Sequence, residues 1–140
     1  MSPKQKNISF ALLLLAVVLF YTFSGNSIGI QLDFGEDALT VSASDRDWLL
    51  PYDQIESISL SPLPDVGTME WGINKRTLRC GTWINEIYGS YTLCVDPRID
   101  SCIVITLEND GIFVLNYENS DSTEQLHKMF TDLLHSKGYQ

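Results

Sequence analysis

The stretch SCIVITLENDGIFVLNY, residues 101–117, decides the fold of this chain. Residues 101–107 are rich in β-branched side chains, residues 108–111 (ENDG) have the composition of a tight turn, and residues 112–117 resume an apolar strand. This pattern predicts a β-hairpin. The chain on either side of it then has to supply the rest of a β-rich domain.

A helix is predicted directly after the hairpin, over residues 121–138. Ser122 and Gln125 stand at capping-box spacing at its start, and Gly138 ends it. Its apolar residues repeat at helical period and form one stripe, which predicts a face packed on a sheet rather than a ligand site. These stripe residues are Leu126, Met129, Phe130, Leu133 and Leu134.

Strand patterns continue on the N-terminal side of the hairpin. They cover residues 88–95, 75–83, 54–60, 38–43 and 30–34, with a short extended piece at 48–52. Residues 65–74 are glycine-rich and lack a firm period, so they predict a long loop beneath which Trp71 would be tucked. About seven strands followed by one helix predict an α+β fold in which the helix caps a β-sandwich or barrel.

The N-terminus carries an apolar segment. Residues 8–23 contain no charge, and no charged residue occurs between Lys6 and Asp33. We therefore expect residues 1–28 to be a membrane anchor, spanning at 8–28, and residues 29–140 to form the domain. A cleaved secretory signal ending near Ser24 and a buried core helix are the alternatives. With either an anchor or a signal the lysines stay inside, so the domain lies on the outer side of the membrane or is secreted.

The charge of the domain limits its partners. Residues 25–140 hold seven basic and eighteen acidic residues, a net charge of −11. Such a surface repels phosphate backbones, so we expect no nucleic acid and only weak adhesion to anionic lipid. Lys75, Arg76 and Arg79 form the one basic cluster, and alternation would put Lys75 and Arg79 on one strand face. This cluster is either a solvated strand face or a docking site for an acidic partner or a lipid headgroup.

Three cysteines are present, an odd number for a chain expected outside the cytoplasm. Cys80 and Cys94 each lie seven residues from Ile87, so a hairpin turning there would place them opposite each other. That arrangement permits a disulfide, and the alternative is that all three cysteines are small buried apolar residues.

Signatures of catalysis and of metal binding are absent from the sequence. The chain has no nucleophile elbow, no H-E-x-x-H, no P-loop and no dinucleotide fingerprint. No C-x-x-C pair occurs, and His127 and His135 both fall on the predicted C-terminal helix. We therefore expect no enzyme activity, no metal and no cofactor. A minimal hydrolase would need a cleft that holds a residue with a strongly shifted pKa.

Three phrases resemble the bacterial pleckstrin-homology-like (PH-like) domains. They are LLPYDQIESISLSPLP at residues 49–64, YGSYTLCVDP at 88–97, and the hairpin IVITLENDGIFVLN at 103–116. The resemblance covers roughly residues 30–138. It implies two nearly orthogonal antiparallel sheets of seven strands with a C-terminal helix at one end. It implies no shared chemistry.

The same resemblance bears on lipid recognition. Eukaryotic relatives bind phosphoinositides through basic residues in the first hairpin loop, and the corresponding turn here is Gly35-Glu36-Asp37. An acidic turn argues against phosphoinositide binding. The sequence thus predicts a membrane-anchored interaction module that binds another protein through an exposed apolar patch. The alternative is a secreted or anchored domain that binds a small ligand in an apolar pocket near residues 65–74.

Overall fold

The computed structural model of the protein describes residues 29–139. The elements in chain order are β1 (Ile30–Phe34), β2 (Ala38–Ala43), β3 (Arg46–Pro51), a 3-10 turn (Tyr52–Gln54), β4 (Ile55–Pro62), β5 (Thr68–Asn74), β6 (Arg79–Asn85), β7 (Gly89–Val95), β8 (Ser101–Leu107), β9 (Ile112–Leu115) and α2 (Ser120–Ser136). The predicted anchor at residues 8–28 lies outside the described residues. Within them, no helix is both long enough and apolar enough to cross a membrane.

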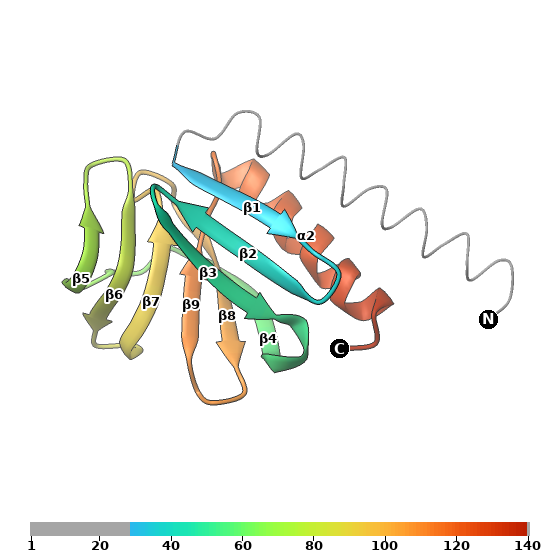
Figure 1. The fold of residues 1–140 in the computed structure, drawn as a ribbon. Helices are drawn as coiled ribbons and strands as arrows, with labels where there is room; N and C mark the ends of the chain where they lie inside the picture. Colours follow the sequence, from blue (N-terminus) through green and yellow to red (C-terminus); the bar gives the residue numbers. More distant parts are fainter. Residues whose placement is uncertain (1–28, 140) are drawn as a thin grey trace, which may run out of the picture.

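The strands form two sheets, and β1 to β3 make the smaller one as a simple meander (Figure 1). The larger sheet has the order β4-β8-β9-β7-β6-β5, in which β7 and β9 run parallel and all other neighbours antiparallel. The α+β class is therefore confirmed. Of the two expected forms, sandwich or barrel, a closed barrel is not present, because no hydrogen-bonded strand pair joins the two sheets in the described part of the chain. The described strands number nine rather than about seven, and one pair is parallel.

The main core lies between the two sheets and α2. Alternate residues of β2 point inward, including Leu39 and Val41, and meet Ile103 and Ile105 of β8 in the same cluster. The apolar stripe of α2 is buried as predicted. Phe130 on this stripe packs edge-on against Phe34, with ring centroids 5.2 Å apart. The helix thus covers the end of the core beside β1, β4 and β8.

A second core lies on the opposite face of the larger sheet. The chain must travel from β4 at one edge of that sheet to β5 at the other, and residues 63–67 make this crossing. Val66 and Leu63 pack there against Trp83, Tyr91 and Leu93. The Tyr91 hydroxyl donates a hydrogen bond of 2.8 Å to the Val66 carbonyl. The crossing segment therefore covers the centre of this face.

The predicted hairpin at residues 101–117 is confirmed, since β8 and β9 pair antiparallel from Ile103 opposite Leu115 to Thr106 opposite Ile112. Its second strand ends at Leu115.

The start of α2 differs from the prediction: the N-cap is Asn119, whose Oδ1 accepts a hydrogen bond from the Ser122 backbone N–H. The capping box expected at Ser122 is not formed because the helix begins earlier, at Ser120.

The loop predicted at residues 65–74 is wrong over most of its length, because Thr68–Asn74 forms β5. The apolar residues Met69, Trp71 and Ile73 alternate along this strand, but the glycines at 67 and 72 led to the prediction of a loop. The strand predicted at 75–83 instead begins at Arg79. Residues 75–78 form a turn in which the Lys75 N–H donates to the Leu78 carbonyl at 2.9 Å.

Candidate interaction surface

Exposed apolar side chains gather at the β5 end of the larger sheet. Four large ones lie on β5, on β6 and in the turn after β6. They are Met69, Trp71, Ile84 and Ile87, with exposed fractions of 40%, 52%, 40% and 64%. We call these four residues and the free edge of β5 the β5–β6 surface. We call the edge free because β6 is the only neighbour of β5 among the described strands (Figure 1).

The strand register places these side chains on both faces of the sheet. Met69 lies opposite Trp83, which belongs to the second core. Trp71 lies opposite Thr82. Thr82 is two residues from Cys80 on the same strand, so both are on the face of the sheet that belongs to the main core, and Trp71 is on that face too. The bulge between Met69 and Trp71 makes this change of face. The apolar surface therefore wraps around the edge strand rather than covering a single face.

Trp71 is in contact with the smaller sheet through one residue. The guanidinium carbon of Arg46, at the start of β3, lies 3.9 Å from the centre of the Trp71 ring. This is a cation–π contact, and Trp71 is still half exposed beneath it. The smaller sheet thus extends over this face as far as Arg46. The prediction that Trp71 is tucked beneath a loop is wrong.

The structure separates the three basic residues that the sequence grouped. Lys75 and Arg76 lie in the turn between β5 and β6, and Arg79 is the first residue of β6. The side chain of Arg79 lies over Trp83, with its guanidinium carbon 5.8 Å from the ring centre. Its Nε is buried without a hydrogen-bond partner in the described part of the chain. A single strand face shared by Lys75 and Arg79 is therefore not present.

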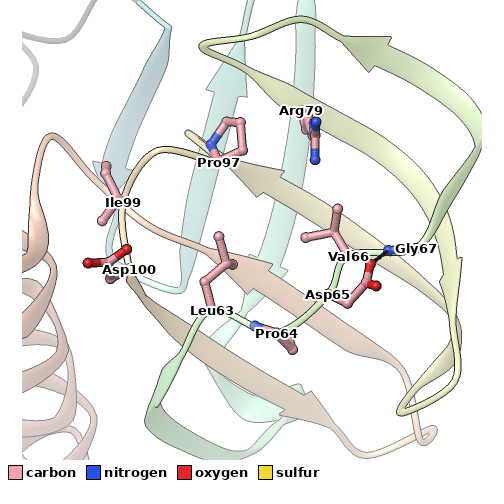
Figure 2. Close-up of a pocket in the computed structure, with 9 residues that line it drawn as sticks. All are labelled: Leu63, Pro64, Asp65, Val66, Gly67, Arg79, Pro97, Ile99 and Asp100. Carbon is pink, nitrogen blue, oxygen red and sulfur yellow. Dashed lines mark hydrogen bonds between the residues drawn. The ribbon is translucent and has the colours of Figure 1, made fainter.

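A small pocket of about 320 Å³ lies between the crossing segment and the connection from β7 to β8. Figure 2 shows its lining residues, with Arg79 on one side and Asp65 and Asp100 among the others. Asp65 is already engaged, because its Oδ1 accepts a hydrogen bond from the Gly67 N–H at 2.9 Å. This pocket adjoins the start of the 65–74 segment, but charged groups line it. It is not the apolar pocket expected there.

A larger pocket of about 730 Å³ lies at the start of β1. Ile30 and Leu78 supply its apolar lining, and Lys75, Asp96 and Arg98 are among its charged residues. Arg98 and Asp96 form an ion pair of 2.7 Å with each other. The hydrogen bond from Arg98 lowers the pKa of Asp96. The pocket therefore combines an apolar wall with charges that are partly paired.

The cysteines lie on two faces of the larger sheet. Cys80 on β6 and Cys94 on β7 are direct cross-strand neighbours in the main core, with their Sγ atoms 2.8 Å apart. The hydrogen bond with Cys80, together with burial, raises the pKa of the Cys94 thiol. Cys102 belongs to the second core, where burial raises its pKa to about 11. The structure therefore brings together the pair that the sequence singled out.

The remaining shifted pKa values follow from core packing. Burial raises the pKa of Tyr52 and of Tyr91, and each hydroxyl donates to a backbone carbonyl, that of Gly35 and of Val66 respectively. Within residues 29–139, no group of three or more His, Cys, Asp or Glu side chains is placed to hold a metal ion. The two tyrosine hydroxyls are thus held in the cores by backbone hydrogen bonds.

Sequence reasoning missed β5 and the exposure of Trp71. A signal was present, since Met69, Trp71 and Ile73 alternate with Glu70, Gly72 and Asn74, as in a strand. No protein-family model, no curated protein and no solved structure matches this chain.

Proposed function

We propose that this protein is a membrane-anchored, non-enzymatic interaction module. Residues 8–28 hold it in the membrane, and the acidic domain lies on the outer side and binds another protein. The observation that carries the binding function is the β5–β6 surface. Its four large apolar side chains remain 40% to 64% exposed in the isolated domain. Soluble domains rarely leave such residues clustered at a sheet edge unless a partner covers them.

Anchoring rests on the sequence. The uncharged run from residue 7 to residue 32 is long enough to span a hydrocarbon core of about 30 Å as a helix. Lys4 and Lys6 precede it and favour an orientation with the N-terminus inside. β1 begins at Ile30, so only a short connection separates the proposed span from the folded domain. The domain would therefore sit close to the membrane surface.

A PH-like fold is part of the same proposal. Two sheets packed on a C-terminal helix agree with what the resemblance implies. The nine described strands, the parallel pairing of β7 with β9 and the open edges depart from the family pattern. The acidic turn between β1 and β2 leaves phosphoinositide binding out of the proposal. The resemblance thus supports a binding module without indicating its partner.

The second candidate function is binding of a small ligand, by a domain that is either anchored or released after signal cleavage. The larger pocket favours it, because about 730 Å³ is within the usual range for ligand sites. We rank it second because its charged lining residues include an internal ion pair, Asp96 with Arg98, which a ligand would have to compete with.

Site-specific photo-cross-linking in cells tests the interaction function. A photoreactive phenylalanine analogue is introduced in the full chain at Ile84, and in a second chain at Leu49 as the matched control. Leu49 is 65% exposed and apolar, but it lies on the outer face of β3. We expect a discrete cross-linked protein from position 84 and none from position 49. Equal adducts from both positions, or none from position 84, would contradict the proposal.

A further inference from the structure

We propose that the partner binds by adding an extended, basic segment to the free edge of β5. This inference rests on the proposed function and specifies how its surface is used. The added segment would form a new strand beside β5 and place basic side chains next to Glu70 and Trp71. Strand addition to an open sheet edge is a recurrent mode of peptide recognition.

The backbone of β5 is available for pairing. β5 is hydrogen-bonded to β6 on one side and is the last strand of its sheet, so its outward N–H and C=O groups have no strand neighbour among residues 29–139. Its first four residues, Thr68 to Trp71, are all exposed. Proline and lysine are devices that commonly block such edges, and β5 contains neither.

Two other edge strands of the described sheets, β4 and β3, are better protected. β4 at the opposite end of the larger sheet packs against α2 and ends at Pro62. β3 carries the charged pair Arg46-Asp47 and ends at Pro51. The bulge in β5 limits regular pairing to part of the strand, and the residues after it, Gly72 to Asn74, are in regular register with β6. β5 is therefore better suited to accept a strand than β3 or β4.

β5 and β6 approach each other very closely at one point. Gly72 of β5 and Gly81 of β6 are direct neighbours with φ values of 137° and 117°. A Cβ atom on Gly72 would lie 2.0 Å from the Cys80 carbonyl oxygen, so the two strands approach as only glycines allow.

The chemistry of the edge selects basic side chains. Glu70 lies in the bulge next to Trp71 in the chain. Its Oε2 accepts a hydrogen bond of 3.3 Å from the Ser90 hydroxyl of β7, an exposed contact with a neutral donor that does not compensate the carboxylate charge. The contact of Arg46 with Trp71 shows that this ring accepts a guanidinium. A basic side chain from the partner would pair with Glu70 and stack on the exposed part of Trp71.

The net charge decides between a foreign segment and a second copy of this chain. The domain carries a net charge of −11, so two copies repel each other, whereas a basic segment is attracted over a long range. A dimer formed by two β5 edges is therefore disfavoured. The occupant we infer is a basic extended segment of another protein.

The test uses the full chain in detergent micelles and a phage-displayed library of random segments of seven residues, the length of β5. We expect selected segments to alternate apolar and basic residues, and their synthetic peptides to slow hydrogen exchange in residues 68–74. Trp71→Ala should weaken binding by about tenfold or more, and Leu49→Ala should leave it unchanged.

Two further peptides separate strand pairing from charge attraction. The best binder with alternate backbone amides N-methylated keeps its charge but loses strand hydrogen bonds, and it should bind at least about tenfold more weakly. The same peptide with glutamate in place of each basic residue should not bind. The inference would be overturned if either altered peptide bound as tightly as the original peptide. It would also be overturned if the library yielded no binder, or if the chain sedimented as a dimer that depends on β5. Cross-linking from position 84 without strand pairing would overturn this inference alone and leave the interaction function standing.

Discussion

We expect Cys80 and Cys94 to be joined by a disulfide in protein taken from an oxidising compartment. The two residues are directly opposite on adjacent strands, where Cα atoms are typically about 4.5 to 5.5 Å apart, within the range that a disulfide spans. Their Sγ atoms are already in contact at 2.8 Å. Two thiols would be oxidised and the disulfide of a cellular oxidoreductase reduced, so two protons and two electrons pass to that disulfide.

The size of the effect follows from the loop that the bond closes. The loop of about 15 residues from Cys80 to Cys94 corresponds to about 3 kcal/mol of the free energy of unfolding in the chain-entropy model. In a domain of this size, that free energy corresponds to roughly 10 °C in Tm. Reduction should therefore lower the Tm of the wild-type chain by roughly that amount.

The assay compares each protein with itself, with and without a reducing agent. Cys80→Ala removes the bond, so its Tm should not respond to the reducing agent, and any cavity it creates affects both measurements equally. Cys102→Ala is the matched control, because Cys102 lies in the second core on the other face of the sheet, and it should keep the full response. Three alkylated thiols in unreduced, denatured wild-type protein would refute the reasoning.

Three further predictions concern the stability of the domain. Burial raises the pKa of Cys102 from its ordinary value of 9.0 to about 11. The stability that this thiol contributes is therefore complete below about pH 9 and is lost as the pH rises toward 11. In denaturation of the reduced protein across this range, the free energy of unfolding should fall less steeply with pH for Cys102→Ala than for the wild type. Gly72→Ala should destabilise the domain by roughly 2 to 4 kcal/mol through backbone clash with β6, whereas Gly89→Ala, which has a positive φ but open space around it, should cost about 1 kcal/mol. Equal losses in urea denaturation would show that the β5–β6 approach is not tight. Asn116 is fully buried and hydrogen-bonds three backbone groups near the β7 to β8 connection, two of them on Asp96. Asn116→Ala should therefore lower the free energy of unfolding by about 2 to 3 kcal/mol. A loss below about 0.5 kcal/mol would show that this network does not hold the connection.

Features fixed by neighbouring residues were predictable from the sequence. The hairpin of β8 and β9 follows from β-branched runs on either side of a turn, and α2 follows from an apolar stripe at helical period. The hairpin that aligns Cys80 with Cys94 needed only the distance of each cysteine from Ile87. In each case the decisive information lies within about 15 residues of chain.

Features that depend on distant segments were not predictable. The parallel pairing of β7 with β9 and the crossing of residues 63–67 over the larger sheet are set by packing between segments far apart in sequence. β5 was missed although its apolar residues alternate, because Gly67 and Gly72 led to the prediction of a loop. The exposure of Trp71 was missed because most aromatic side chains in a small domain are buried, and only the bulge reveals that this one faces outward.

The central claim is that an uncleaved segment displays this domain outside a membrane. The most direct test is the intact mass of the chain from the membrane and soluble fractions of expressing cells, after intact cells have been treated with a protease that cannot cross the membrane. We expect full-length chain in the membrane fraction of untreated cells, and loss of the domain after treatment. A soluble product that begins near Ser24, or a full-length chain protected from the protease, would contradict the account.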